Sequence, residues 1–480
     1  MSSSYYNQEK ATHPGQFTLL PVVNIIPYND IGQSAHQVLN IFPLIREINI
    51  YESIYQPFIT GNVVILDTAN MFESEFPVVG MERLEFQIMT PGVEGFYDFQ
   101  SQTGFPVHVY AVTDRTSSPQ DLAQQYVLHF CSQEMFRNKT SYVSKAVYNT
   151  HENIVAELLE RHMNSKKALI LEKSVNRHKY VLPYANPLTH INTIAEKTQS
   201  AYHDNPGYLF FENMYGFNFR SLQGLTNLNN GDVRQSKHGV VYESRRTDTR
   251  GGGDANIDFK LGGIYHYDIK QQFDTIDSVV DGAYSSELIF HDQLTKKFGS
   301  KIFKYNEHFS GQPKMEEGQG SKMGNLIYKD NKQFQELPTK RFFKSSTSKL
   351  FSQSSITQAS EVDITQKRAS KKSHISNCDI EIEVPGYLGI ATGDVIDVNF
   401  PKKSHTTTNT YEQDAESRMS GKYLIKSIRH TFDTSNQGMH KMLLRISKDA
   451  FNVVLPNTQT DTFTSLETDK NRGVIESPQI

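Results

Sequence analysis

The pair His151-Glu152 is the part of this sequence that comes closest to a metal-protease signature. A zinc site of the His-Glu-x-x-His type needs a second histidine four residues after the first, so that both rings share one helical face. That position is Val155, and His162 lies too far along the predicted helix. We therefore interpret Glu152 as an acidic residue in the first turn of a helix, where it meets the positive end of the helix dipole.

Other residues that could do chemistry also lack the pattern that their reaction requires. Gly251-Gly252-Gly253 is not followed by the Lys-Ser/Thr of a phosphate loop, so we interpret it as a linker. Cys131 and His129 are two residues apart in a predicted strand, a spacing typical of one sheet face rather than of a nucleophile and its base. The sequence thus predicts no catalytic, cofactor-binding or metal-binding residues, and no enzyme.

Length indicates the number of domains, and charge disfavours one function, general binding of nucleic acids. A chain of 480 residues predicts roughly three domains of about 150 residues each. The net charge is −4, and the first 140 residues hold 6 basic and 14 acidic side chains, which disfavours general nucleic-acid binding. We interpret a basic cluster without interleaved aromatic residues as a solvated helix face or an interface rim; it consists of Lys367, Arg368, Lys371 and Lys372.

The two cysteines, Cys131 and Cys378, exclude a disulfide framework and a cysteine-rich zinc site, and they fit a reducing compartment. The N-terminal residues are polar, and the apolar stretch from Thr18 to Ile26 is interrupted and far shorter than the roughly 20 residues of a membrane helix. We expect a protein that is made in a cytoplasm and stays soluble or joins an assembly built there.

Hydrophobic periodicity predicts three kinds of segment. Residues 17–135 alternate with period two, as do residues 376–450, which indicates half-buried antiparallel sheets in small sandwiches or barrels. Residues 150–204 predict two helices, capped by Thr150 and Asn186, followed by a hairpin from Tyr208 to Arg220. Strand-like material resumes at Ile264 and at 283–290. Residues 311–375 are rich in Ser, Gln, Lys and Thr, which predicts a long loop or an extension ordered only by a partner.

A short internal echo links the two β regions. Residues 59–65 (Ile-Thr-Gly-Asn-Val-Val-Ile) resemble residues 391–397 (Ala-Thr-Gly-Asp-Val-Ile-Asp), and both are predicted to begin a strand after a glycine turn. Chance explains a match of this length, or the first and last β domains are duplicates and a long insertion splits one of them.

Several stretches, scattered over about half of the chain, share a pattern with one known family: residues 393–398 (GDVIDV), 421–425 (GKYLI), 428–432 (IRHTF), 443–446 (LLRI) and 448–450 (KDA), and earlier 216–222 (GFNFRSL) and 284–288 (YSSEL). In these stretches and in the order of its segments, the chain resembles the baseplate hub proteins of contractile-tailed bacteriophages. The fold that the resemblance implies is α+β and mainly β, with two tail-tube-like antiparallel β-barrel or sandwich domains, a small α+β domain between them, and an insertion in the second.

The implied domains are as follows: an N-terminal arm at 1–16, tube-like β domain I at 17–140, the small α+β domain at 141–223, tube-like β domain II split between 224–282 and 376–452, an insertion with a Ser/Gln/Lys-rich loop at 283–375, and a flexible C-terminal tail at 453–480. The long stretch 311–375 departs from the family pattern and leaves the contacts of the outer surface open.

The resemblance also implies a function. Hubs of this family are non-enzymatic homotrimers whose two tube-like domains per chain form a pseudo-sixfold ring. That ring joins the tail tube to the threefold central spike in the virion baseplate and lets DNA pass during genome ejection without binding it specifically. The implied partners are the spike, the tail tube or tube-initiator protein, the baseplate wedge proteins and, as a further candidate, the tape measure protein, with no membrane insertion and with assembly in the host bacterial cytoplasm.

Two alternatives stay open at this point. A contractile injection system or a type VI secretion system uses hubs of similar architecture. A tail-associated cell-wall hydrolase is the enzymatic alternative, which rests on scattered carboxylates and 17 histidines.

Overall fold

A computed structural model of the chain describes residues 15–27, 38–68, 70–74, 76–93, 95–117, 123–175, 177–202, 206–226, 241–243, 262–292, 296–308, 337–346, 361–376, 378–400, 419–434 and 438–449. Most of the predicted N-terminal arm, the Gly251–Gly253 linker and the C-terminal tail lie outside these residues. Among the described helices, none combines the length and apolar character needed to cross a membrane.

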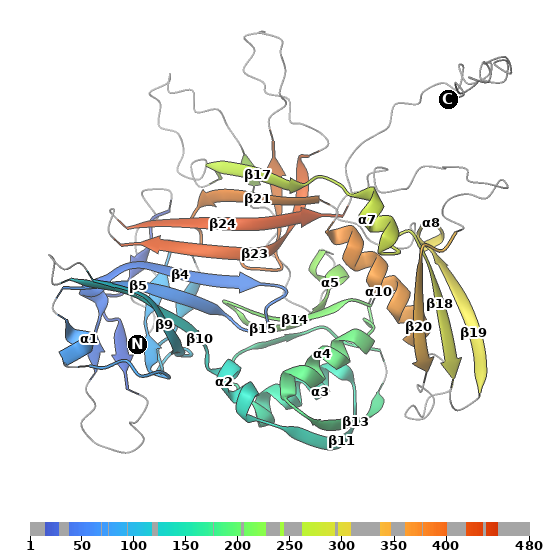
Figure 1. Cartoon of the computed structure of the whole chain (residues 1–480). Coiled ribbons are helices and arrows are strands. Elements are labelled where there is room, and N and C mark those ends of the chain that lie inside the picture. The colour runs from blue at the N-terminus through green and yellow to red at the C-terminus, as the bar shows by residue number, and fades with distance from the viewer. Residues whose placement is uncertain are drawn as a thin grey trace, which may run out of the picture.

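One large sheet forms the main body, in the order β17-β21-β24-β23-β4-β5-β10-β9-β6-β2-β3, with β22 beside β23 and β16 beside β22 (Figure 1). Neighbours are antiparallel except for β16 and β22. The strands are β2 (Asn24–Ile26), β3 (Leu39–Asn40), β4 (Ile45–Ser53), β5 (Thr60–Asp67), β6 (Arg83–Glu85), β9 (Val107–Ser117), β10 (Gln124–Ser132), β16 (Val241–Glu243), β17 (His266–Gln271), β21 (Cys378–Pro385), β22 (Val395–Asn399), β23 (Gly421–Asp433) and β24 (Met439–Lys448).

Residues 15–132 form an N-terminal module around their own core. A small sheet of β1 (Thr18–Leu19), β7 (Gln87–Met89) and β8 (Phe96–Asp98) faces the main sheet, and η1 (Phe42–Leu44) and α1 (Met71–Ser74) are short connections. Every second residue of β5 is buried, as alternation predicts. The rings of Phe86, Phe99 and Phe130 meet in the core between the sheets.

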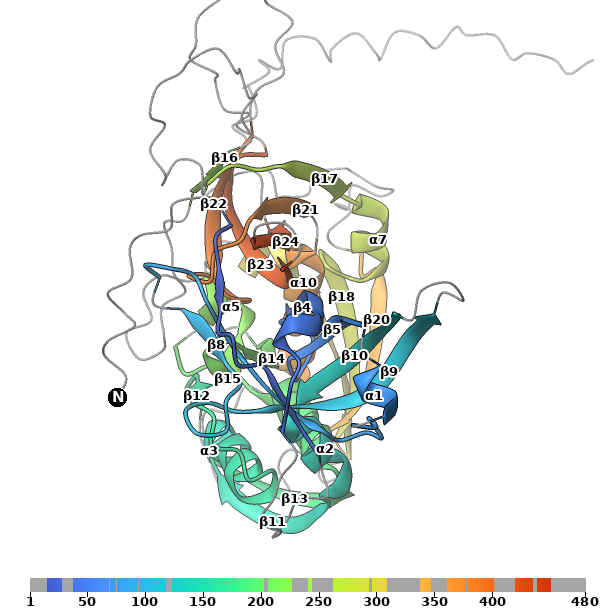
Figure 2. The same cartoon turned by 90° about the vertical axis from the view of Figure 1, so that its left-hand side faces the viewer.

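The described residues 241–243, 262–271, 378–400, 419–434 and 438–449 form a C-terminal module with a second core. β17 pairs with β21, and β16 pairs with β22, so strands from two distant parts of the chain share one sheet. Figure 2 shows this module above the N-terminal module, with the helical unit at the opposite end.

Residues 133–226 form an α+β unit. Its elements are α2 (Gln133–Thr140), β11 (Val143–Asn149), α3 (His151–Glu157), the π-helical turn η2 (Leu158–His162), β12 (Leu169–Leu171), β13 (His178–Ala185), α4 (Pro187–Lys197), β14 (Tyr208–Asn213), β15 (Gly216–Ser221) and α5 (Leu222–Thr226). Both predicted helices and the predicted hairpin are confirmed. Asn186 is the N-cap of α4, but its side chain donates to the carbonyls of Asn138 and Ser141 instead of capping the helix.

Residues 275–308, 337–346 and 361–375 form a separate lobe at the right of Figure 1. It contains α7 (Thr275–Val280), β18 (Ser285–Asp292), β19 (Lys297–Lys304), α8 (Tyr305–His308), β20 (Lys340–Ser346) and α10 (Glu361–Ile375). The prediction of a loop over 311–375 is therefore wrong for β20 and α10.

Periodicity did not reveal the extent of helix α10 because most of the side that it buries is polar, although Ile364 and Ile375 are buried too. Gln366, Ser370 and Lys371 are all buried, and each has a partner outside the helix. The Gln366 amide donates to the carbonyl of Ser286, and the Ser370 hydroxyl donates to the carbonyl of Ala283. Hydrogen bonds thus replace the apolar contacts on which periodicity depends.

The two similar stretches, residues 59–65 and 391–397, do not have the same backbone conformation. Gly61 lies inside β5, where an added Cβ would contact the carbonyl of Asn49 and the ring of Phe130. Gly393 lies in a turn before β22 with a φ of +87°, a conformation that favours glycine. The expectation that both stretches begin a strand after a glycine turn is wrong for residues 59–65.

Candidate assembly interface

The two modules join edge to edge through β23 and β4. Their register runs from Ser427 opposite Ser53 to Asp433 opposite Glu47, so the pairing continues over most of β4. It makes one continuous antiparallel sheet of eight strands, β17-β21-β24-β23-β4-β5-β10-β9, out of two separate cores.

The side chain of Asn49 connects the strands on both sides of this seam. Its Oδ1 accepts hydrogen bonds from Arg429 Nε at 3.2 Å and from the Thr431 hydroxyl at 2.8 Å, both on β23. Its Nδ2 donates to Asn62 Oδ1 on β5 at 2.9 Å and to Glu47 Oε1 at 2.5 Å. Asn49 is almost completely buried, its hydrogen bonds are partly buried, and they add to the backbone ladder.

On the opposite face of β4, the buried Glu52 connects three parts of the chain. Its Oε1 accepts from the Tyr97 hydroxyl in β8 and from the backbone N–H of Met214 in the α+β unit, both at 2.7 Å. Its Oε2 accepts from the backbone N–H and the hydroxyl of Thr392 in the C-terminal module, at 3.3 and 3.2 Å. Burial raises the pKa of Glu52 to about 7, although the hydrogen bonds oppose that shift.

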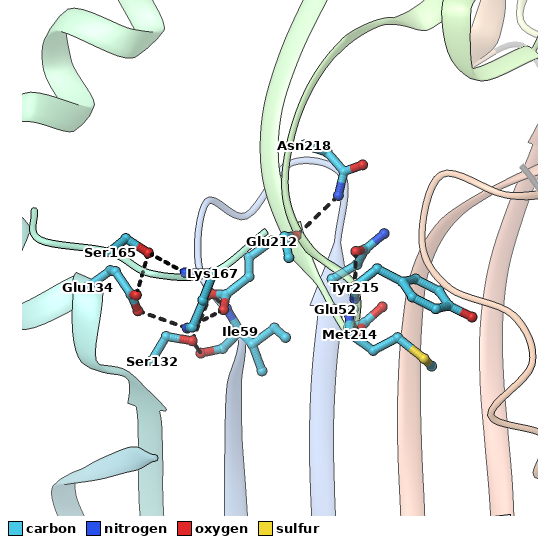
Figure 3. Close-up of polar contacts among 12 residues, drawn as sticks. Glu52, Ile59, Ser132, Glu134, Ser165, Lys167, Glu212, Met214, Tyr215 and Asn218 are labelled. Atoms are coloured by element: carbon cyan, nitrogen blue, oxygen red, sulfur yellow. Dashed lines mark hydrogen bonds and ion pairs between the residues drawn. The ribbon is translucent and has the colours of Figure 1, made fainter. Parts of the chain in front are cut away.

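A second buried cluster attaches the α+β unit to the N-terminal module. Lys167 Nζ lies 2.8 Å from Glu134 Oε2 and 2.5 Å from Glu212 Oε1, between the two carboxylates (Figure 3). Glu212 Oε2 also accepts from the Ser132 hydroxyl at 2.7 Å and from the Ile59 backbone N–H at 2.9 Å. Glu134 also accepts from the Ser165 hydroxyl at 2.8 Å, so each carboxylate has the Lys167 ammonium and at least one further donor, as buried charges require.

Charge and burial act in opposite directions on these pKa values. Burial raises the pKa of Glu212, and the Lys167 ammonium opposes that shift without cancelling it. For Glu134 burial is likewise opposed by Lys167, and here the pKa is lowered. The two carboxylates raise the pKa of Lys167 against its burial. The adjoining cavity of about 120 Å³ is small beside usual ligand sites of roughly 300–1,000 Å³. We interpret the Lys167 cluster as a polar contact that holds the α+β unit against the N-terminal module.

The pair His151-Glu152 makes contacts within the fold of the α+β unit. His151 is buried at the start of α3, where its ring stacks on His178 and its Nε2 lies 2.8 Å from the Tyr180 hydroxyl. Glu152 is in the first turn as predicted, and its carboxylate accepts from the backbone N–H and the hydroxyl of Ser174. Within the described ranges, no three His, Cys, Asp or Glu side chains are grouped as a metal ion would need.

Cys131 and His129 do not act on each other in this structure. His129 Nε2 lies 2.8 Å from the Thr113 hydroxyl, and Cys131 is buried. Burial raises the pKa of the Cys131 thiol to about 12, which opposes formation of a nucleophilic thiolate.

The basic cluster on α10 is only partly at the surface, contrary to the sequence interpretation. Lys371 is buried and forms an ion pair of 3.2 Å with the buried Asp449, because α10 packs against the end of β24. Arg368 pairs with Glu196 of α4 at 3.4 Å. This cluster therefore connects the lobe to the rest of the molecule.

The continuous sheet has two open edges among the described residues. β17 pairs with β21 on one side, and its other side faces no described strand. β9 pairs with β10, but β6 covers it only at Val107 and His108, which leaves residues 110–117 uncovered. Since every neighbouring pair among the eight strands is antiparallel, β9 and β17 run in opposite directions.

The face of the sheet that carries Asn49 is polar and nearly balanced in charge. The register places six acidic and four basic side chains on it: Glu47, Asp268, Asp379, Glu381, Glu383 and Asp433, with Lys270, Arg429, Lys441 and Arg445. Lys426 at the bulge of β23 adds a fifth positive charge, 3.3 Å from Asp379. The N-terminal module contributes mainly amides and hydroxyls to this face. Several acidic side chains of that module are buried instead, namely Glu52, Asp67 and Glu82.

Comparison with known proteins gives similar solved structures. No protein-family model matches the chain, and no curated protein matches it. The structure is similar to the tail protein from Neisseria meningitidis MC58, with a TM-score of 0.49 and 11% identity over 91% of this chain and 98% of that chain. It is also similar to the 43 kDa tail protein of prophage MuSo2 from Shewanella oneidensis, with a TM-score of 0.47 and 9% identity over 90% of this chain and 99% of that chain.

A third similar structure comes from a secretion system. It is the E. coli c3393 protein, a component of the type VI secretion system with structural similarity to the T4 bacteriophage tail proteins gp27 and gp5. The TM-score is 0.39, and the identity is 7% over 92% of this chain and 80% of that chain. The solved structures named here are thus tail proteins and a type VI secretion component.

Proposed function

We propose that this chain is a structural hub of a phage contractile-tail baseplate, which forms a homotrimeric, pseudo-sixfold ring between the tail tube and the threefold central spike. The observation that carries the proposal is the run of eight antiparallel strands that joins two modules in one chain. It has two edges without a neighbouring described strand, β17 and residues 110–117 of β9. Uncovered strand edges favour pairing with another chain.

The strand directions fit a closed ring. Rotation about an axis along the strands keeps each strand's direction, so β9 of one copy would meet β17 of the next copy in the antiparallel sense already used throughout the sheet. Three copies would supply six modules, and closure would remove both edges. The edges expose apolar side chains, Tyr110 and Val112 on β9 and Ile269 on β17, that pairing would cover.

The polar face would then line the passage. Its opposite charges nearly cancel, and the N-terminal module lines it with amides and hydroxyls, so it offers no concentrated positive charge that would hold a phosphate backbone. DNA would pass without specific binding. The spike, the tail tube or tube-initiator protein, the wedge proteins and the tape measure protein are the partners that this role requires, and the virion tail is the corresponding location.

The same geometry would serve a hub of a contractile injection or type VI secretion system, and the neighbouring genes distinguish these settings. We propose a non-enzymatic role in each. The carboxylates at the unit junctions bind hydrogen-bond donors of the chain itself, as Glu52 and Glu212 do, and no observation favours the cell-wall hydrolase.

Light scattering coupled to size-exclusion chromatography tests the proposal, with and without the co-expressed spike protein. We expect a mass of about three chains of 54.7 kDa each. The variant Ile269→Pro removes an N–H at the open edge of β17. The carbonyl of Glu383 faces β17, since it accepts from Tyr265, so His266–Glu383 and Asp268–Glu381 are the hydrogen-bonded pairs and the N–H of Ile269 points away from β21. We expect this variant to shift toward monomer, while Ile269→Val stays trimeric.

A wild-type chain that remains monomeric with the spike present would contradict the proposed trimer. A trimer unaffected by Ile269→Pro would show that β17 is not the joining edge.

A further inference from the structure

The strands β9 and β23 are built alike, each at one edge of its own module. In each module a short antiparallel strand covers only the start of a long one: β6 pairs with β9 at Val107 and His108, and β22 pairs with β23 over residues 421–424. Each long strand then skips one residue in its pairing with the strand on its other side, Tyr110 in β9 and Lys426 in β23. The two long strands are therefore equivalent.

The turn before each short strand is built alike as well. In the C-terminal module, Gly393 has a φ of +87°, and its N–H donates to the carbonyl of Ile425. The N–H of Ile425 donates in return to the carbonyl of Asp394. The Asp394 carboxylate then accepts from the backbone N–H of Ala391 at 3.0 Å, which closes the turn.

The N-terminal module repeats these hydrogen bonds one for one. Met81 has a φ of +67°, its N–H donates to the carbonyl of Val109, and the N–H of Val109 donates to the carbonyl of Glu82. The Glu82 carboxylate accepts from the backbone N–H of Val79 at 2.6 Å. The stretch Val79–Glu82, which we call the Val79 turn, is thus equivalent to residues 391–394.

These two equivalent turns differ in what covers them. Ala391 and Thr392 are 0% and 1% exposed, because the end of β4 and the α+β unit lie against them. Glu52 of β4 accepts from the backbone N–H and the hydroxyl of Thr392, and Asn213 of the α+β unit donates to its carbonyl. Val79, by contrast, is 82% exposed.

The seam inside the chain indicates which part of a neighbouring copy reaches such a turn. β4 runs antiparallel to β23, ends opposite Ser427, and continues into the buried Ile54, which lies in one apolar cluster with Val395 of β22. Ala111 is the equivalent of Ser427, because each follows the skipped residue. β17 placed along β9 in the same way pairs with it from Ala111 onward, and its C-terminal end then lies at the Val79 turn of the next copy.

Apolar side chains are exposed directly after β17. Phe273 is 63% exposed, and Ile276 and Val280 of α7 are 76% and 62% exposed. Ile276 and Val280 are four residues apart, so they share one side of the helix. Ser278, on its other side, is buried in the lobe.

We propose that, in the ring, Phe273 and the exposed side of α7 cover the Val79 turn of the next copy of this chain, as the end of β4 covers residues 391–394 within one chain. This inference rests on the proposed function, because it takes β9 and β17 as the joined edges. It adds the position of one copy along the next, and it supplies apolar contacts to a joint otherwise made of backbone hydrogen bonds.

Cysteine crosslinking of the oligomer tests the inference. The double variant Val79→Cys/Ile276→Cys is treated with a short bismaleimide, and both native cysteines, Cys131 and Cys378, are buried. Val79 and Ile276 belong to opposite edges of the eight-strand run, so a link between them joins two chains. We expect products of two and three chains on denaturing gels, with the residue 79 peptide joined to the residue 276 peptide by mass spectrometry.

The matched control is Val181→Cys/Ile276→Cys. Val181 is 65% exposed but lies on β13, on the far side of the α+β unit from the main sheet (Figure 1). Its yield of linked chains should be at least tenfold lower than that of Val79→Cys/Ile276→Cys. Equal yields, or a trimer in which the Val79 variant gives no linked chains, would overturn the inference.

A second measurement does not depend on the reach of the crosslinker. Ile276→Asp places a charge on the exposed side of α7, and an acidic residue in the first turn favours a helix, so the single chain should fold normally. We expect the chain concentration at which the trimer dissociates to rise at least tenfold in sedimentation equilibrium, because the contact would bury that charge. Val181→Asp should change it less than twofold, and an equal effect of both variants would contradict the contact.

The proposed function can fail separately from this inference. A trimer that dissociates with Ile269→Pro but shows neither the crosslink nor the effect of Ile276→Asp keeps the proposed ring and overturns only the contact of α7 with the Val79 turn. A wild-type chain that stays monomeric with the spike present overturns the proposed function, and this inference with it.

Discussion

Lys167 lies between two buried carboxylates, and both depend on its charge. The change Lys167→Met keeps most of the side-chain volume but leaves Glu134 and Glu212 buried without a cation. We expect a loss of about 3–5 kcal/mol in the free energy of unfolding, measured by urea denaturation, because an uncompensated buried charge is that costly.

The matched control is Lys145→Met. Lys145 also pairs with a glutamate, Glu157 at 2.6 Å, but both side chains are partly exposed. We expect a loss of about 0–1 kcal/mol from this pair. Equal losses of unfolding free energy for both variants would contradict the interpretation that the Lys167 cluster holds the α+β unit against the N-terminal module.

Two buried histidines predict acid sensitivity. His430 Nδ1 lies 3.1 Å from His440 Nε2 in the core, and burial lowers the pKa of His430 to about 3. In the unfolded chain the ring gains its proton near pH 6.5, while the folded chain excludes it. This lowers the free energy of unfolding as pH falls below about 6.5, by at most about 1.4 kcal/mol per pH unit for one ring.

The variant His430→Phe should therefore show a shallower loss of stability between pH 6.5 and 4 than the wild-type chain. Urea unfolding at several pH values measures this slope. Parallel profiles for the two proteins would contradict the assignment of His430 as a neutral, buried ring.

The pH dependence of stability that Glu52 contributes has the opposite sign to that of His430 between about pH 4.5 and 6.5. Its folded pKa of about 7 exceeds its ordinary value of 4.5, so the stability linked to its proton is present below 4.5 and is lost as pH rises through 7. The sequence held a signal for this residue: Glu52 follows Ile48 and Ile50 in the apolar phase of β4. Its partners, however, come from positions 45, 162 and 340 residues away, which no periodicity relates.

At the scale of elements, the seam between β4 and β23 depends on Asn49. The change Asn49→Ala removes its bonds to Arg429, Thr431 and Asn62 and leaves these polar groups without that partner in a nearly buried place. We expect a loss of about 1–3 kcal/mol in the free energy of unfolding by urea denaturation.

Gln125→Ala is the control for the seam, because Gln125 is exposed on the same face of the sheet. Its effect should stay within about 0.5 kcal/mol. If both variants lose equally little unfolding free energy, the side-chain hydrogen bonds of Asn49 do not strengthen the β4–β23 seam.

Periodicity predicted the elements whose buried side is apolar. The hairpin of β14 and β15, the helix α4 behind Pro187 and the strand β21 all follow their sequence patterns. Periodicity failed for α10, which buries the polar residues Gln366, Ser370 and His374. It also failed for β20, where the two apolar residues of Lys-Arg-Phe-Phe are adjacent and polar residues flank them in the sequence. The predicted fold class, α+β and mainly β with antiparallel sheets, is confirmed.

At the scale of the whole molecule, the sequence could not predict how the two modules meet. The β4–β23 pairing joins residues about 380 positions apart, and the pattern of a strand indicates its faces but not its neighbour. The acidic excess of the first 140 residues likewise does not give the charge of the polar face, because several carboxylates of the N-terminal module are buried. The domain boundaries stay a prediction.

Electron cryomicroscopy of the purified oligomer at a resolution that separates strands tests the central claim most directly. We predict threefold symmetry, a central passage lined by the face that carries Asn49 and Arg429, and β9 of each chain paired antiparallel with β17 of the next. A map in which β9 and β17 of neighbouring chains lie apart, or in which that face points away from any passage, would contradict it.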